Sequence, residues 1–115
     1  MSEDIFAYFL ESLETLENLL HAETQAIAAH ELDTIDAIML QKDESLRNLL
    51  SAKDRLGQDP RNNQIANEKI DFVMNLQSRN ALSFKKLKDK TELKNKQNSC
   101  SSINGGKARS AYLNG

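Results

Sequence analysis

The sequence predicts an all-α protein, an antiparallel three-helix bundle or coiled coil whose long third helix overhangs the other two. Two observations lead to this prediction. Apolar residues recur at helical spacing along most of the 115 residues, and helix breakers are rare, with one Pro and four Gly, three of them in the last eleven residues. A β-sandwich or barrel would need a turn about every 8–12 residues, so both are excluded.

The first helix is expected over residues 3–29. Its large apolar side chains fall on one arc of roughly 140° when each residue advances by about 100°. Ser2 is a suitable N-cap, and Glu3 and Asp4 suit the positive end of the helix dipole. The apolar arc contains Ile5, Phe9, Leu13, Leu16, Leu19, Leu20 and Ile27.

A second helix is expected over residues 33–56, with Asp33 as its cap and Gly57 as its end. The apolar stripe shifts by roughly 90° across residues 29–32, which a single straight helix could not bury on one side. A tight turn near His30 therefore separates the first two helices. The second stripe contains Ile35, Ile38, Met39, Leu46, Leu49, Leu50 and Leu56.

The third helix is expected over residues 60–96, because Asp59 can cap it and Pro60 suits its first position. The three helices would form one domain, residues 1–97. Residues 98–115, rich in Asn, Ser and Gly, are expected to be a flexible C-terminal tail. The third stripe contains Ile65, Phe72, Val73, Leu76, Phe84 and Leu87.

The sequence offers little for catalysis, so we expect no enzyme, cofactor or metal site. His21 and His30 are nine positions apart and do not share a helix face, and Cys100 stands alone in a Ser-rich stretch. A zinc site would need His or Cys pairs, and a nucleophile would need a positioned base. A single cysteine and an acidic N-terminus that is unlike a secretory signal favour the cytoplasm.

Charge is distributed unevenly along the chain. Residues 1–30 carry six acids and no Lys or Arg, whereas residues 58–97 carry nine bases and five acids. An acidic helix packed beside a basic one explains this pattern, and so does a basic half that meets an acidic partner. Asp89 interrupts the basic run, so nucleic acid is not expected as a partner. No apolar run reaches ~18 residues, so no membrane insertion is expected.

A second apolar surface suggests a protein partner or a homodimer seam. Leu82, Leu93 and Met74 leave the core arc of the third helix, and Lys86 lies between the two leucines. Exposed apolar residues on a second helix face favour partner binding, although scattered surface leucines are also common. The tail returns to apolar character at its end. The expected partner-binding residues are therefore Met74, Leu82, Lys86, Leu93, Tyr112 and Leu113.

Two charged residues fall on apolar arcs. Glu23 lies in the middle of the first stripe, and Lys42 lies inside the second. With a turn near residue 31, an antiparallel hairpin brings these two positions within one helical turn of each other. We therefore expect an ion pair that sets the register of the hairpin, since desolvation offsets much of its attraction. The alternative is that Lys42 extends its ammonium outward to water.

Several short motifs resemble the FlgN-type flagellar export chaperones. Leu76-Gln77-Ser78-Arg79-Asn80 is similar to a stretch of that family's third helix, and residues 108–115 resemble its closing Tyr-x-x-Gly element. The resemblance to the family's first hairpin rests on Glu23, Ala26-Ile27, His30-Glu31-Leu32-Asp33, Ile35, Ile38, Lys42 and Leu46.

This resemblance implies a cytoplasmic chaperone that binds the terminal helices of hook–filament junction proteins. It would deliver them to the export gate of the flagellar type III apparatus, using its C-terminal region to hold the substrate. A generic helical adaptor, a coiled-coil scaffold or another type III secretion chaperone would share the same composition and remains the alternative.

Overall fold

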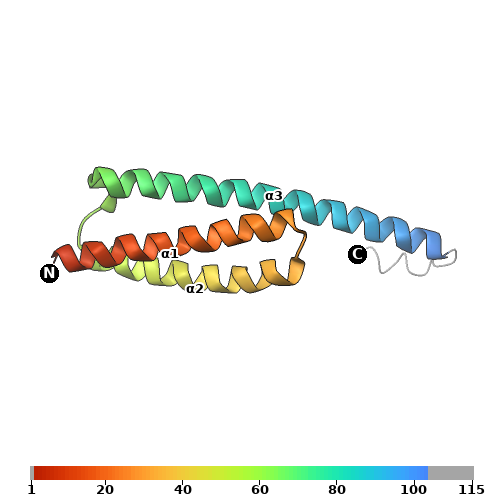
Figure 1. The fold of residues 1–115 in the computed structure, drawn as a ribbon, viewed down its shortest axis with the longest axis horizontal. Coiled ribbons are helices and arrows are strands. Elements are labelled where there is room, and N and C mark those ends of the chain that lie inside the picture. The colour runs from red at the N-terminus through yellow and green to blue at the C-terminus, as the bar shows by residue number, and fades with distance from the viewer. Residues whose placement is uncertain (1, 104–115) are drawn as a thin grey trace. The chain divides into compact units, whose positions relative to one another are not determined.

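The protein is all-α, as the sequence predicts. The computed structural model describes residues 2–103, which contain three α-helices and no strand. They are α1 (Ser2–Ala28), α2 (Leu32–Leu56) and α3 (Gln64–Ile103), with a short 3₁₀ helix, η1 (Pro60–Asn62), before α3. In Figure 1, α1 and α2 run in opposite directions.

The chain divides into two units, Met1–Leu82 and Ser83–Gly115, and the boundary lies inside α3. The first unit contains α1, α2, η1 and α3 as far as Leu82. With 40 residues, α3 is the longest helix, as expected, but it continues to Ile103 instead of ending near Lys96. The expected tail therefore begins with helix at residues 98–103. Tyr112 and Leu113 lie outside the described residues.

The turn between α1 and α2 lies where the shift of the apolar stripe predicted it. Glu31 N donates to Ala26 O over 2.9 Å, and His30 N donates to Ile27 O over 3.1 Å. These two bonds define a Schellman motif, in which His30 takes the left-handed conformation with φ of 59°. The expected cap of α2 was wrong, because Glu31 occupies that position, without a side-chain bond, and Asp33 lies inside the helix.

The connection between α2 and α3 uses two caps in place of the single one expected. Gly57 ends α2 with φ of 70°. Asp59 accepts a hydrogen bond from the Arg61 backbone N–H at 3.0 Å, but it caps η1 and not the long helix. Asn63 caps α3, since its Oδ1 accepts from Ala66 N at 3.0 Å. The Pro60 turn therefore redirects the chain before α3 begins.

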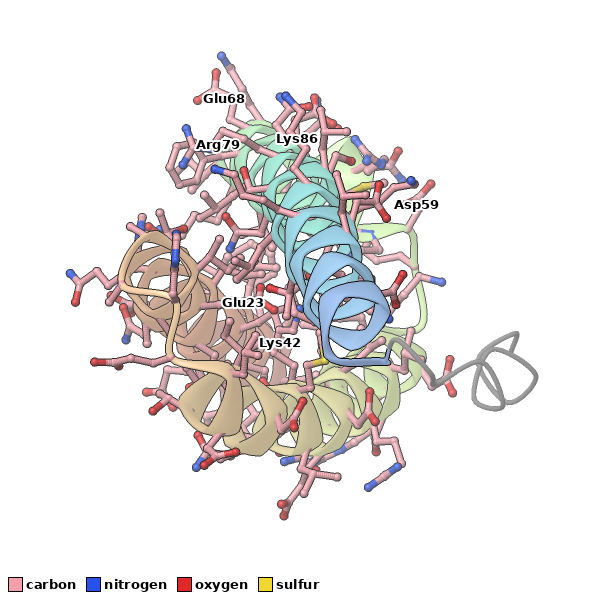
Figure 2. All side chains as sticks on the ribbon, turned by 90° about the vertical axis from the view of Figure 1, so that its right-hand side faces the viewer. Glu23, Lys42, Asp59, Glu68, Arg79 and Lys86 are labelled. Atoms are coloured by element: carbon pink, nitrogen blue, oxygen red, sulfur yellow. The ribbon has the colours of Figure 1, made fainter. Side chains whose placement is uncertain are left out.

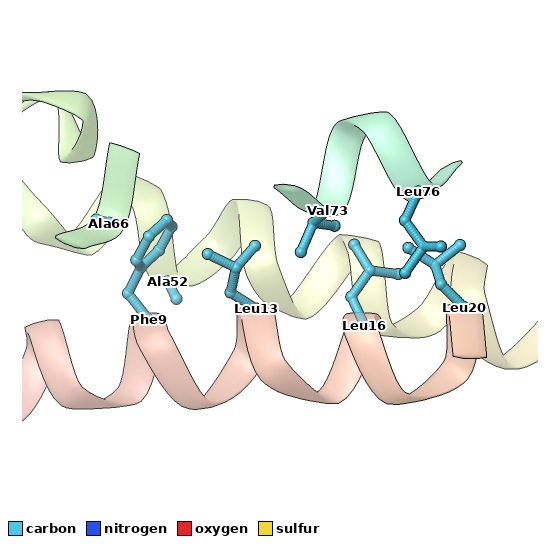
Figure 3. Packing of buried hydrophobic residues seen from close by; sticks show 8 residues of the cluster. All are labelled: Phe9, Leu13, Leu16, Leu20, Ala52, Ala66, Val73 and Leu76. Carbon is cyan, nitrogen blue, oxygen red and sulfur yellow. The ribbon is translucent and has the colours of Figure 1, made fainter. Parts of the chain in front are cut away.

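The core of the first unit gathers side chains from all three helices. Figure 3 shows the α1 side chains Phe9, Leu13, Leu16 and Leu20 pointing toward residues of α2 and α3. Ala52 and Ala66 are fully buried in this cluster, so methyl groups fill two of its positions. The cluster consists of Phe9, Leu13, Leu16, Leu20, Ala52, Ala66, Val73 and Leu76.

Several residues that the sequence predicted in the core are exposed. Leu46 and Leu50 of α2 are exposed, as are Ile65 and Phe72 of α3. Small or polar side chains occupy other buried positions on the three helices. These unexpected buried residues are Ser12, Ser45, Ala52, Ala66 and Asn80. Leu87, in the second unit, is buried as expected.

Candidate functional site

A buried polar network lies among the helices of the first unit, and the expected ion pair is at its centre. Lys42 Nζ donates to Glu23 Oε1 over 2.9 Å. Glu23 is 2% exposed, and the Lys42 side chain is 13% exposed. Figure 2 shows both labelled side chains in the middle of the bundle. A buried carboxylate needs such a partner, because an unpaired charge would cost several kcal/mol to desolvate (about 3–5 kcal/mol when one partner is removed).

The network reaches α3 through Asn80, which the sequence analysis did not identify as buried. Asn80 Nδ2 donates to Glu23 Oε1 over 3.1 Å and to the Leu20 carbonyl over 2.8 Å. Thr24 Oγ1 lies 2.8 Å from Asn80 Oδ1 and donates to it. Every polar atom of the Asn80 side chain is thus paired, which is what allows an amide to be buried.

Lys42 also binds Gln77, so its ammonium links α2 to α1 and to α3. The distance from Lys42 Nζ to Gln77 Oε1 is 2.9 Å. An ammonium has three N–H donors, of which these two bonds use two. The bond to Gln77 spans the space between α2 and α3.

An apolar groove of about 640 Å³ lies between α2 and α3, and side chains of α1 form its floor. It lies entirely within the first unit. On α2 it runs from Lys42 to Lys53, and on α3 from Ile70 to Ser78. Its lining residues are Phe9, Leu13, Leu16, Lys42, Asp43, Leu46, Leu49, Leu50, Lys53, Asp59, Pro60, Arg61, Ile70, Val73, Met74, Gln77 and Ser78.

Large apolar side chains are left exposed on both walls of this groove. Leu46 and Leu50 on α2 are 45% and 52% exposed, and Met74 on α3 is 56% exposed. Along the α2 wall, from Lys42 to Lys53, the buried residues are the small Ser45 and Ala52. The neighbouring Leu46 and Leu50 line the groove instead. The groove therefore offers apolar surface that the bundle itself does not cover.

Both charge signs occur at the rim of the groove. Asp43 and Lys53 stand on α2, while Asp59 and Arg61 come from the connection that closes one end. Arg61 is held in place, because its Nη1 donates to Asp71 Oδ1 over 2.9 Å and its Nη2 lies 3.4 Å from Met74 Sδ. An apolar floor between charged edges matches the pattern of an amphipathic helix.

A separate ion pair joins α1 and α3 outside the groove. Lys69 Nζ lies 2.6 Å from Glu17 Oε1, and His21 Nε2 lies 3.1 Å from Glu17 Oε2. The Lys69 ammonium holds the pKa of the Glu17 carboxyl below its ordinary value, with His21 adding to the effect and burial opposing it.

Only part of the expected binding surface coincides with the groove. Met74 lines it, whereas Leu82 is exposed elsewhere on the first unit. Lys86 and Leu93 are exposed in the second unit. Leu46 and Leu50 were missed, because their place in the α2 stripe marked them as core.

Within residues 2–103, no helix is long and apolar enough to cross a bilayer. No cluster of three or more His, Cys, Asp or Glu side chains in the same part of the chain is arranged to hold a metal ion.

No protein-family model, no curated protein and no solved structure matches the chain.

Proposed function

We propose that this protein binds an amphipathic helix of a partner protein in the groove between α2 and α3. The observation that carries the proposal is that Leu46, Leu50 and Met74 are exposed on the two facing walls of an apolar groove. Helix-in-groove recognition uses apolar side chains at i, i+3, i+4 and i+7 on one face of the ligand helix. Such a helix would complete a four-helix arrangement in the first unit.

The dimensions of the groove favour a helix over a larger protein surface. The α2 wall, Lys42 to Lys53, spans about 16 Å, which is three turns of helix. A helix of this length and about 10 Å in diameter has a lateral surface of roughly 500 Å², of which only part can be buried. A standard interface buries about 800 Å² per partner, so the groove alone is too small to hold a stable dimer. A short helix that binds reversibly fits this surface better.

We further propose that the function is that of an export chaperone for hook–filament junction proteins. The motif resemblance to FlgN-type chaperones supports this function. The groove supplies an apolar surface suited to the terminal helix of a substrate, although it lies in the first unit and not in the C-terminal region to which the resemblance assigns substrate binding. Covering an apolar helix would keep the substrate from associating too early. Ordering a flexible segment costs free energy, about 2–5 kcal/mol, so binding would stay weak enough for release at the export gate.

The test is calorimetric titration with synthetic peptides copied from the terminal helices of hook–filament junction proteins. Leu46→Glu and Leu50→Glu should each weaken binding at least tenfold, because a carboxylate cannot be desolvated on the apolar wall. Both residues are about half exposed, so the fold should persist. The matched control is Leu40→Glu, on the same helix, 72% exposed and outside the groove, which should bind like the unaltered protein.

Two outcomes would contradict the proposal. If no peptide binds, the chaperone function fails. If the protein is a dimer that Leu46→Glu dissociates, a second copy occupies the groove. Binding of unrelated amphipathic peptides with equal affinity would favour a generic helical adaptor over an export chaperone.

A further inference from the structure

The apolar groove is closed at one end by a polar bridge, and this closure has a consequence for its ligand. Lys42 is the last α2 residue that lines the groove in the direction of the α1–α2 turn. Its ammonium binds Gln77 on the opposite wall and Glu23 of α1, each at 2.9 Å. The Lys42 side chain and its two partners therefore connect the two walls of the groove with α1 beneath them. We call this set of contacts the polar bridge.

Displacing the Lys42 ammonium from the polar bridge is energetically unfavourable. Glu23 is 2% exposed and accepts a second hydrogen bond, from Asn80 Nδ2 at 3.1 Å. Moving the Lys42 ammonium outward would leave that buried carboxylate without its cation, which is strongly unfavourable. An apolar ligand side chain placed over the bridge would also have to desolvate the ammonium without giving it a hydrogen bond.

Hydrogen-bonded residues also line the opposite end of the groove. Asp59, Pro60 and Arg61 line it there, and Pro60 is buried. Arg61 is tied to Asn67 at 2.7 Å and to Asp71 at 2.9 Å. The groove thus has two ends that are set by hydrogen-bonded residues, and about three helical turns lie between them.

We infer that the Lys42–Gln77 bridge, held by Glu23, is an end-stop that limits the apolar face of the bound helix to about three turns. Lys42 is then a specificity-determining residue, because a longer apolar stripe gains no further apolar contact beyond it. This inference rests on the proposed function, because it assumes that the groove holds a helix. It goes further in naming the ligand class: a helix whose apolar stripe spans three turns and is followed by polar residues.

The probes are three designed amphipathic peptides. The first carries Leu at positions 1, 4, 8 and 11 of a capped 11-residue helix. The second and third add one turn with one more Leu, at the N-terminal or the C-terminal end. The test variant is Glu23→Gln with Lys42→Met, which removes the bridge while leaving an acceptor for Asn80. The control variant is Glu17→Gln with Lys69→Met, which removes an ion pair of the same composition outside the groove.

The unaltered protein and the control should bind all three peptides within about twofold. The test variant should bind one of the two extended peptides on the order of tenfold more tightly, because one more Leu side chain becomes buried. Which extended peptide gains affinity shows whether the N-terminal or the C-terminal end of the bound helix lies at Lys42. Circular dichroism checks that the variant folds. If it does not, Gln77→Leu, at an exposed position, breaks only the contact across the groove. Because the Lys42 ammonium stays on Glu23, the same peptide should gain by a smaller factor.

The outcomes separate the two proposals. If the unaltered protein binds none of the peptides, the groove does not hold a helix and the proposed function fails. If the unaltered protein binds the 11-residue peptide, the groove holds a helix. The end-stop is then wrong if the unaltered protein already binds an extended peptide more tightly. It is also wrong if the test variant gains affinity for neither extended peptide or for both.

Discussion

The Glu23 carboxylate lies 2.9 Å from the Lys42 ammonium, although 19 positions of sequence and a turn separate them. The pair joins α1 to α2 at one register only, because a shift of either helix would leave both charges buried without partners. Burying an ion pair adds little stability, since desolvation offsets the attraction, whereas breaking one is costly. The pair therefore selects one alignment of the hairpin.

Single and double replacements of this pair should behave very differently. Lys42→Met should lower the free energy of unfolding by about 3–5 kcal/mol, because it leaves the Glu23 carboxylate buried and unpaired. Glu23→Gln combined with Lys42→Met should recover most of that loss. Urea denaturation of the three proteins measures this. Equal destabilisation by the single and the double change would show that the lysine matters for packing and not for charge.

The Glu17–Lys69 pair should make stability depend on pH. The pKa of Glu17 is lowered in the folded protein, so the carboxyl binds its proton less readily there than in the unfolded chain. The resulting stabilisation is complete above the unfolded pKa and is lost as pH falls through the folded pKa. Because Lys69 is partly exposed, it should amount to at most about 1 kcal/mol.

The matching experiment compares Glu17→Gln with the unaltered protein by thermal unfolding across the acid range. At neutral pH the variant should melt lower, and the two curves should converge at low pH, where Glu17 is protonated in both states. A difference that is constant with pH would mean that the ion pair does not contribute.

The two left-handed turn residues should respond in opposite ways to substitution. His30 has a φ of 59°, which costs a non-glycine residue about 1 kcal/mol or more. His30→Gly should therefore raise stability. Gly57 has a φ of 70° and open space around its missing Cβ, so Gly57→Ala should lower stability by about 1 kcal/mol through backbone strain alone. Chemical denaturation of both variants measures the change in the free energy of unfolding, which should be positive for His30→Gly and negative for Gly57→Ala.

The leucines of α3 should divide into stabilising and binding residues. Leu76→Ala should cost about 2–5 kcal/mol, because Leu76 is part of the buried cluster, and the buried Leu87 should also be costly to truncate. Leu82→Ser and Leu93→Ser, at exposed positions, should change stability by less than about 0.5 kcal/mol.

These leucine variants also compare two candidate binding surfaces. The sequence pattern places partner binding at Leu82 and Leu93, whereas the groove depends on Leu46 and Leu50. If Leu82→Ser and Leu93→Ser abolish peptide binding and the groove variants do not, the exposed leucines of α3 form the binding surface and the groove proposal is wrong.

The helices and turns were predictable from the sequence because they depend on local chemistry. Apolar periodicity and the scarcity of Gly and Pro identify the helices, and the phase shift of the stripe identifies the turn at His30. The Glu23–Lys42 pair was predictable as well, because the turn position sets which residues of a hairpin face each other. The end of α3 was not, since a polar stretch can continue a helix to Ile103.

What only the tertiary structure decided is which part of each apolar stripe is buried. A helical wheel shows the apolar side of a helix, but it does not show how close the neighbouring helix comes. Along the α2 wall the small Ser45 and Ala52 are buried, while the larger Leu46 and Leu50 face the groove. Asn80 is buried because partners from α1, remote in sequence, complete its hydrogen bonds.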